Sequence, residues 1–139
     1  MKKKILIGWR EYIDLPEWGV RKLKAKIDTG ARTSALHVEN IKELNSGKIR
    51  FDVILHREHR DRTVRVVAQP IKKAAVKSSI GVKTSRWFVE TLLRIGPVEQ
   101  RIKITLVNRS EMNHRMLLGR TALEGAFLID INRSYLLGE

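Results

Sequence analysis

Short runs of Val, Ile, Leu and Thr, broken by turn-forming residues about every ten positions, constrain the fold of this chain more than any other feature. Residues 20–27 alternate apolar and basic side chains, and residues 100–107 alternate apolar and polar ones. A period of two predicts β-strands that turn one face towards a core. Further strands are predicted at residues 5–9, 11–15, 34–38, 48–56, 63–68, 87–95, 116–119, 127–131 and 135–137. We therefore predict a mainly β fold with one short helical turn, residues 121–124, that ends at Gly125.

Two hairpins are predicted in the second half of the chain. Residues 87–95 and 100–107 are separated by Gly96 and Pro97, which favour a turn. Upstream of them, residues 77–85 are polar, contain Gly81 near their centre and lie between strand-like segments. This composition is typical of a mobile hairpin tip.

Length and composition indicate one domain. The chain has 139 residues, of which 42% are hydrophobic, so we expect a single domain and core over residues 1–139. The absence of cysteine excludes disulfides and thiolate metal sites and fits a reducing compartment. The apolar stretch after the N-terminal lysines covers only residues 5–7, whereas a secretory signal needs roughly 7–15 apolar residues and a membrane span about 18. We expect a soluble cytoplasmic protein that does not enter a membrane.

The charge balance is strongly basic. In total, 28 Lys and Arg residues stand against 15 Asp and Glu residues, which gives a formal net charge of +13. Such an excess predicts an acidic partner, and nucleic acid, a ribosomal surface and acidic peptides are the alternatives. A basic surface that serves only solubility is the simpler interpretation, and composition does not decide between them.

The segment Asp-Thr-Gly-Ala, residues 28–31, carries the candidate chemistry. Asp28 directly follows an apolar strand, which would hold its carboxylate at a rigid strand end, and Gly30 lets the backbone come close to a substrate. The same tripeptide is also ordinary turn chemistry, so by itself it does not define a site. A second pattern lies downstream, where residues 116–123 read Met-Leu-Leu-Gly-Arg-Thr-Ala-Leu.

Together, these segments resemble the retropepsins. In that family a strand ending in Asp-Thr-Gly-Ala is followed by a flap hairpin, a further hairpin, and an apolar-apolar-Gly-Arg segment at the start of a short helix. The order here is the same, with residues 77–86 as the candidate flap and residues 41–76 longer than the retropepsin plan requires. The resemblance implies a closed β-barrel with a flap hairpin and one short helix near the C-terminus.

A closer resemblance is to a bacterial family long described as putative ATP-dependent zinc proteases and now as retropepsin-like. That family is associated with ATP-grasp ligases that add glutamate tails to a ribosomal protein. The matching segments are Gly-Trp-Arg-Glu at 8–11, Leu-Pro at 15–16, residues 25–31, Thr-Ser-Ala-Leu-His at 33–37 and residues 116–120. The resemblance implies an aspartic endopeptidase that acts on a peptide or protein substrate, with an acidic ribosomal-protein tail and a glutamate ligase as candidate partners.

Residue by residue, the resemblance makes Asp28 the catalytic carboxylate. It makes Thr29 the residue whose hydroxyl braces the two active-site loops, and Gly30 a backbone contact for the substrate. Gly119 would pack beneath this loop. The candidate substrate-binding residues are Ala31, Arg32, Ile80, Gly81, Arg86 and Arg120.

One position departs from the retropepsin pattern. Arg120 corresponds to an arginine that pairs, in retropepsins, with an acid just after Asp-Thr-Gly-Ala, but that position here is Arg32. The departure puts the pairing in doubt and places a cation beside the catalytic loop. Arg32, Arg86 and Arg120 are therefore candidates for carboxylate recognition, because a guanidinium can bind a carboxylate through two parallel hydrogen bonds. For each of them, a solvated arginine without a substrate role is the alternative.

A single Asp28 is insufficient for peptide hydrolysis by carboxylates. One carboxylate must take a proton from water while a second, protonated one polarises the scissile carbonyl, and two adjacent carboxylates share a proton. With one Asp-Thr-Gly per chain, the partner must come from a second copy, so we expect a homodimer. Residues 4–7 and 134–137 are candidate strands for joining the subunits, or else edge strands within one subunit.

The sequence does not support a metal or nucleotide cofactor. It contains no His-Glu-x-x-His motif, and His56-Arg-Glu-His59 is one residue short of the inverted form and lies in a charged, hairpin-like region. No Gly-x-x-x-x-Gly-Lys-Ser/Thr loop is present either. We therefore predict an enzyme that needs neither zinc nor any other cofactor.

The alternative function is that of a catalytically inactive basic module that binds RNA, the ribosome or an acidic protein. The net charge supports it. Against it, Trp9, Trp18 and Trp87 lie beside apolar runs and are predicted to belong to the core, whereas binding of single-stranded nucleic acid uses exposed aromatic side chains between cations.

Overall fold

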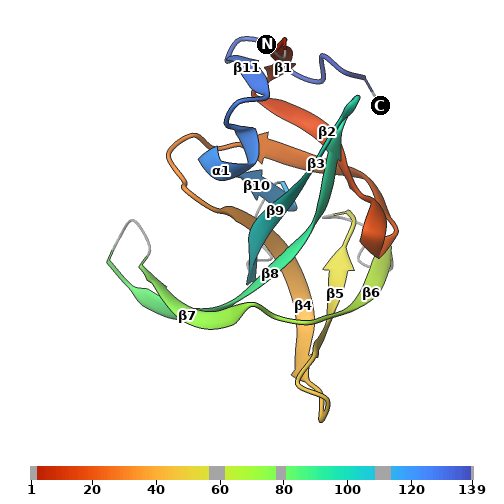
Figure 1. Cartoon of the computed structure of the whole chain (residues 1–139), viewed down its shortest axis with the longest axis vertical. Helices are drawn as coiled ribbons and strands as arrows, with labels where there is room; N and C mark the ends of the chain where they lie inside the picture. The colour runs from red at the N-terminus through yellow and green to blue at the C-terminus, as the bar shows by residue number, and fades with distance from the viewer. Residues whose placement is uncertain (1–2, 57–61, 78–80, 109–113, 139) are drawn as a thin grey trace.

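The computed structural model describes residues 3–56, 62–77, 81–108 and 114–138, and Figure 1 shows their arrangement. The fold is mainly β, as predicted. None of the helices within these ranges has the length and apolar character needed to cross a bilayer. In chain order the elements are β1 (Ile5–Gly8), β2 (Arg10–Leu15), the 3-10 helix η1 (Pro16–Trp18), β3 (Val20–Ile27), β4 (Ser34–Glu43), β5 (Ile49–Ile54), β6 (Thr63–Ala68), β7 (Lys72–Lys77), β8 (Lys83–Ile95), β9 (Val98–Val107), β10 (Met116–Leu118), α1 (Arg120–Leu123) and β11 (Phe127–Asp130).

The short strand β10 closes the sheet into a barrel. It pairs in parallel with β3, with Leu118 beside Ile27, and antiparallel with β4, with Leu117 beside Ala35. These pairings complete the ring β10-β3-β2-β8-β9-β4 and confirm the predicted closed barrel. They also bring the C-terminal ends of β3 and β10 to the same place, although the two strands are far apart in the sequence.

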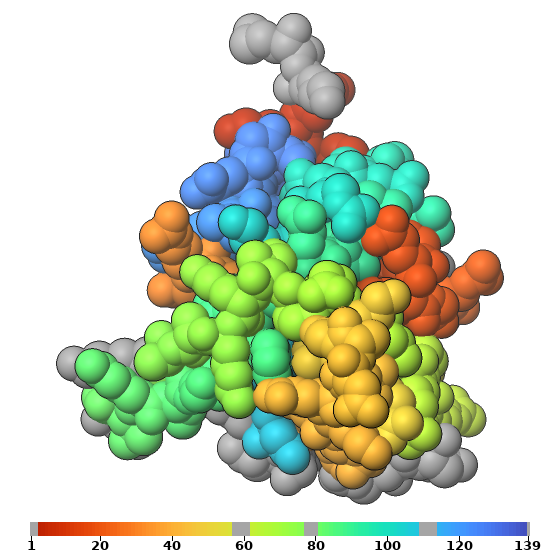
Figure 2. Space-filling view, turned by 60° about the horizontal axis from the view of Figure 1, so that its bottom comes forward, coloured from red at the N-terminus to blue at the C-terminus, as the bar shows by residue number. Residues whose placement is uncertain are grey.

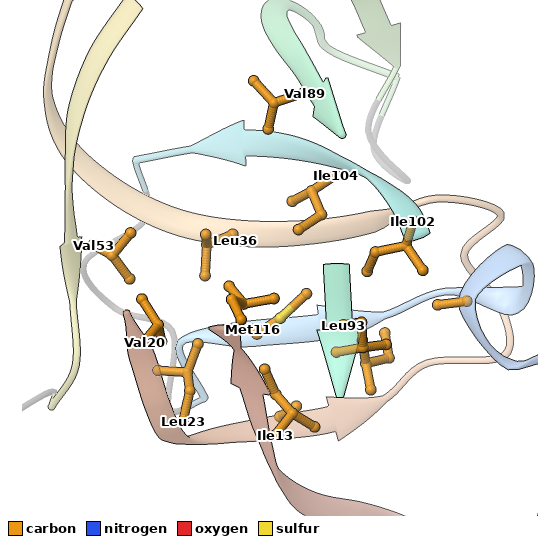
Figure 3. Packing of buried hydrophobic residues seen from close by; sticks show 14 of the residues in the cluster. Ile13, Val20, Leu23, Leu36, Val53, Val89, Leu93, Ile102, Ile104 and Met116 are labelled. Atoms are coloured by element: carbon orange, nitrogen blue, oxygen red, sulfur yellow. The ribbon is translucent and has the colours of Figure 1, made fainter. Parts of the chain in front are cut away.

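Alternating side chains fill the barrel. In β3, Leu23 and Ala25 are fully buried while Lys24 between them and Lys26 after them are exposed, as the period of two predicts. Figure 3 shows how Leu23, Leu36, Ile104 and residues from other strands pack into one interior. Each fully buried Leu or Ile side chain stabilises the fold by roughly 1.5–3 kcal/mol relative to exposure, so the barrel provides a stiff support for the loops at its ends.

The segment that is longer than the retropepsin plan forms an extension of the barrel. β5 pairs with β4 and β6 pairs with β5, while β7 pairs with β8. Lys77 lies opposite Lys83, so residues 83–85 of the predicted hairpin tip belong to strand β8, and Gly81 is exposed. Ile80 and residues 57–61, most of the charged, hairpin-like region after His56, lie outside the described residues.

The C-terminal tail differs from the prediction. Residues 135–137 are not a strand; Tyr135 has a φ of 53°, and the backbone N–H groups of Leu136 and Leu137 donate to the Glu11 carboxylate at 2.9 and 3.3 Å. A buried side chain thus satisfies the donors that a strand would have given to a neighbour. β1 instead pairs in parallel with β11 of the same chain. α1 is followed by Gly125 at φ 78°, the left-handed conformation predicted there.

Candidate active site

The end of β3 positions Asp28. The Asp28 N–H donates to the Leu118 carbonyl at 2.9 Å, which continues the β3–β10 pairing by one residue beyond the strand. One residue earlier, the Ile27 N–H donates to the Trp9 carbonyl at 2.8 Å. The backbone at residues 27 and 28 is therefore held on two sides. The partly buried side chain of Asp28 leaves the barrel at a defined position.

The loop after β3 folds back on the carboxylate. The Gly30 N–H donates to Asp28 Oδ1 at 3.1 Å, and the Ala31 N–H donates to the Asp28 carbonyl at 3.2 Å. A hydrogen bond from a backbone N–H to a carboxylate is stronger than one between neutral groups, and here it orients the carboxyl group. Thr29 and Gly30 are exposed, so the side of the loop that carries Asp28 is accessible.

The start of α1 supports the loop from the other side. The Arg120 N–H donates to the Ala31 carbonyl at 2.8 Å, while the Thr121 N–H and hydroxyl donate to the Arg32 carbonyl at 3.1 and 3.0 Å. Arg120 Nη1 also donates to the Thr29 carbonyl at 2.9 Å. With Arg32 in place of the expected acid, the Arg120 guanidinium thus binds the loop backbone. This contact places the Arg120 side chain against the loop.

Gly119 allows the two segments to touch. A Cβ atom at this position would lie 2.7 Å from the Thr33 carbonyl carbon and 2.9 Å from that of Arg32, closer than real contacts allow. Its N–H donates to the hydroxyl of the fully buried Ser34 at 3.1 Å, and the Ser34 carbonyl accepts from the Thr105 hydroxyl at 3.2 Å. Ser34 and Thr105 were not predicted as part of the site. Ser34 lies in residues 33–37, one of the segments that resemble the bacterial family, and this resemblance was the sequence signal that could have pointed to it.

A pocket of about 580 Å³ opens beside the loop. It runs between the loop end at Arg32 and Thr33 and the hairpin residues Lys72 and Phe88. In Figure 1 the loop between β3 and β4 and strand β7 lie on the same side of the molecule. Figure 2 shows the lime residues of β7 in front, between the blue C-terminal residues above and the orange-yellow β4–β5 hairpin below. The lining residues are Arg32, Thr33, Ile71, Lys72, Phe88, Glu90, Arg101, Ile102, Lys103 and Thr121.

The pocket is basic. Of its cations, Arg101 is held by Glu17 at 3.0 Å and lies 3.7 Å from Glu90, and hydrogen bonding to Glu17 raises the Arg101 pKa. Arg32 and Lys103 are exposed and line the same pocket without an acid bound to either among the ion pairs of the described residues. The pocket can therefore accept a negatively charged group.

The other predicted site residues are not in this pocket. Arg86 lies on β8, and its Nε donates to the Thr84 hydroxyl at 3.2 Å. Gly81 is exposed near the hairpin tip, and Ile80 is outside the described residues. The structure thus brings Asp28, the loop and Arg32 together, whereas neither Gly81 nor Arg86 lines the pocket.

Metal-binding side chains do not gather at the site. Among the residues with a described placement, no group of three or more His, Asp or Glu side chains could hold a metal ion. The His56–His59 segment falls largely in residues 57–61, outside the described part of the chain.

Comparison with known proteins places this geometry in a family. A family model described as "Retropepsin-like aspartic endopeptidase RimB" matches residues 6–139. The chain belongs to this family. It is also 34% identical, over 142 residues, to a probable alpha-L-glutamate ligase of Parasynechococcus marenigrum, and 36% identical, over 139 residues, to one of Desulfotalea psychrophila. The match covers 100% and 98% of this chain but 30% of each relative, so the chain corresponds to less than a third of those proteins.

A solved structure has the same fold. The crystal structure of a Legionella pneumophila protein of unknown function superposes with a TM-score of 0.78 and 25% sequence identity. The superposition covers 97% of this chain and 99% of the other. The retropepsin-like family and its barrel are thus established by sequence and by architecture.

Proposed function

We propose that this member of the RimB-like retropepsin family is an aspartic endopeptidase in which Asp28 carboxylates from two copies activate water. The main observation in support is the position of Asp28, which lies at the end of a barrel strand with Oδ1 oriented by the Gly30 N–H. Buried Ser34 and the Arg120 guanidinium hold the surrounding loop. This support favours a carboxylate that keeps its orientation through a reaction.

The mechanism requires both carboxylates. The ionised Asp28 takes a proton from water, which attacks the scissile carbonyl, while the protonated Asp28 of the second copy donates a hydrogen bond to the carbonyl oxygen. The proton is then passed to the leaving amine. Two adjacent carboxyl groups favour this division of roles because both cannot ionise at close range.

Exposed apolar side chains support a dimer at the β1–β11 sheet. Leu6 and Leu128 lie opposite each other in the parallel pair, so they share one face, and they are 45% and 54% exposed. Ile131, just after β11, is 77% exposed. Covering these side chains with a second copy would bury apolar surface, which favours association.

For the substrate, we propose an acidic peptide such as a glutamate tail. The basic pocket beside the loop places Arg32, Lys72 and Lys103 where side-chain carboxylates could bind. The names of the relatives, probable alpha-L-glutamate ligases, are consistent with a glutamate-linked chain as the material that is cleaved. The resemblance to the family adds a ribosomal protein as the bearer of the tail.

The catalytic role is tested by Asp28→Asn. Wild-type protein should cleave a poly-glutamate-tailed peptide, and Asp28→Asn should lose nearly all cleavage because the dyad can no longer share a proton. Asp14→Asn, which changes a carboxylate on the outer face of β2, serves as the matched control and should keep activity. Cleavage that survives Asp28→Asn, or that a chelator abolishes while Asp28 is dispensable, would contradict the aspartic mechanism.

The substrate class is tested separately with Arg32→Gln. We expect a higher KM for the acidic peptide and an unchanged KM for a neutral peptide of equal length, measured by steady-state kinetics. Losing one carboxylate contact should cost about 1–3 kcal/mol, or roughly 5- to 150-fold in kcat/KM. Equal effects on both peptides would argue against recognition of the acidic side chain.

A further inference from the structure

We propose that the outer face of β2 and β3, formed by Arg10, Tyr12, Lys24 and Lys26 together with Tyr135, binds single-stranded RNA. This surface, here called the β2–β3 face, lies outside the barrel. None of its residues lines the pocket beside Asp28. The proposal therefore does not depend on peptidase activity.

Cations stand next to one another on this face. In the antiparallel β2–β3 pair, Arg10 lies opposite Lys26 and Tyr12 lies opposite Lys24. Both lysines are exposed, and their strand neighbours Ala25 and Ile27 point into the core. Two positive side chains directly opposite each other destabilise a strand pair. An anionic ligand that lies across both strands would relieve this repulsion.

The pKa of His114 indicates how closely these cations gather. It is lowered from its ordinary value first by burial and then by the positive charges of Arg10, Lys26 and Lys24. The His114 ring thus lies within the electrostatic influence of three cations that come from two strands. The nearest acid on the outer side of β2, Asp14, lies at the far end of the strand, where it accepts from the Lys22 N–H at 2.9 Å and is 3.9 Å from Arg94.

Aromatic rings alternate with the cations. Tyr12 and Tyr135 are stacked, with ring centroids 4.5 Å apart and planes inclined by 24°. The Arg10 guanidinium lies 5.1 Å from the centre of the Tyr135 ring and 4.6 Å from that of Trp9. Both tyrosines are partly exposed. Trp18 and Trp87 pack against the core as predicted, whereas Trp9 instead contacts Arg10 and, at 6.0 Å, the His114 ring.

This combination favours single-stranded RNA over an acidic protein. Both partners would satisfy the cations, but only unpaired bases also use the flat faces of aromatic rings. A duplex hides its base faces inside the stack and offers mainly phosphates. Tyr12 and Tyr135 are far apart in the sequence and come together only because the tail after β11 folds over β2.

The test uses the full chain and a fluorescent single-stranded RNA of about 12 nucleotides, a length within the usual site sizes. Anisotropy titrations should show binding that Lys24→Gln/Lys26→Gln weakens at least about tenfold, with the slope of log affinity against log salt falling by about 1.4. The matched control is Lys42→Gln/Lys48→Gln, which removes the same charge from exposed positions around the β4–β5 turn. We expect the control to change affinity less than about threefold.

Further measurements test whether the tyrosine rings contribute to binding and whether the ligand is RNA and not an acidic protein. Tyr12→Leu, checked for folding by circular dichroism, should weaken the binding of single-stranded RNA about tenfold. It should change the binding of duplex RNA only a little. Asp28→Asn should keep full RNA affinity, so loss of peptidase activity and loss of RNA binding are separable. Equal losses in the two lysine double variants would overturn the proposal. So would tighter binding of a poly-glutamate peptide that depends on Lys24 and Lys26, since the face would then serve an acidic protein.

Discussion

At the scale of single residues, the site depends on contacts that hold the Asp28 loop rather than on Asp28 alone. Gly119 lets the α1 segment touch the loop backbone at Arg32 and Thr33, and its N–H is bound by buried Ser34. Arg120 then reaches the Thr29 carbonyl. The resemblance implied that Gly119 packs beneath the loop, and the close approach agrees with it. The contacts of Ser34 and Arg120 depend on side-chain directions that local sequence does not encode.

Gly119→Ala should therefore damage the site directly. The new Cβ would lie within 3 Å of backbone atoms that cannot move independently, so we expect a loss of about 1–3 kcal/mol in the free energy of unfolding and a large loss of cleavage. Urea unfolding and peptide kinetics at a temperature well below unfolding would measure the two effects. Gly47→Ala is the control: it introduces strain at a φ of 86° in the β4–β5 turn, away from the loop. It should lower stability but keep activity, and equal activities in the two variants would contradict the supporting role of Gly119.

At the scale of elements, alternating strands were predictable and the tail was not. β3 spans Val20–Ile27 as predicted, because each buried side chain alternates with an exposed cation except at Lys22, which has a φ of 53°. Residues 135–137 have the composition of a strand, yet the N–H groups of Leu136 and Leu137 donate to Glu11, which is 125 positions away from Leu136 in the sequence. A local pattern carries no information about such a distant acceptor. β7 was likewise not predicted as a strand, because lysines occupy half of its positions and leave no clear alternation.

Asp52, in the β4–β5–β6 extension, is expected to make the stability of the fold depend on pH in acid. Hydrogen bonds from Arg65 and then Asn40 to Asp52 lower the pKa of this carboxyl below its ordinary value of 3.8. A carboxyl group whose pKa is lower in the folded state stabilises the fold at pH values above its unfolded-state pKa. This stability is lost as the pH falls through its folded-state pKa. Stability should thus decline below about pH 4. In Asp52→Asn that part of the decline should disappear, as measured by urea unfolding between pH 2 and 7.

The control for this prediction is Glu43→Gln, an exposed carboxylate at the end of β4. Its acid profile should follow that of the wild type. If Asp52→Asn also keeps the wild-type profile, the Arg65 and Asn40 contacts do not stabilise the ionised carboxylate in solution.

At the scale of the whole molecule, the proposed chemistry depends on a second copy. Leu6→Ser/Leu128→Ser would remove the paired exposed side chains of the β1–β11 sheet without touching the core. We expect weaker association in sedimentation, and a specific activity that falls on dilution and partly recovers at high concentration. Ile41→Ser/Val67→Ser changes side chains that are 37% and 51% exposed on the β4–β5–β6 extension, and should leave both properties unchanged. A fully active monomer of the first variant would contradict the shared dyad.

The buried Glu11 carboxylate has a consequence for how the molecule can be joined to others. It accepts from Gly8 at 2.7 Å near one end of the described chain and from Leu136 near the other, so one side chain fastens both ends to the barrel. In Figure 1 both ends lie at the top of the view, on the opposite side of the barrel from the β7–β8 hairpin. A linker could therefore connect the ends and new termini could be opened in the turn at 45–47, giving a circular permutant with its hairpin side untouched.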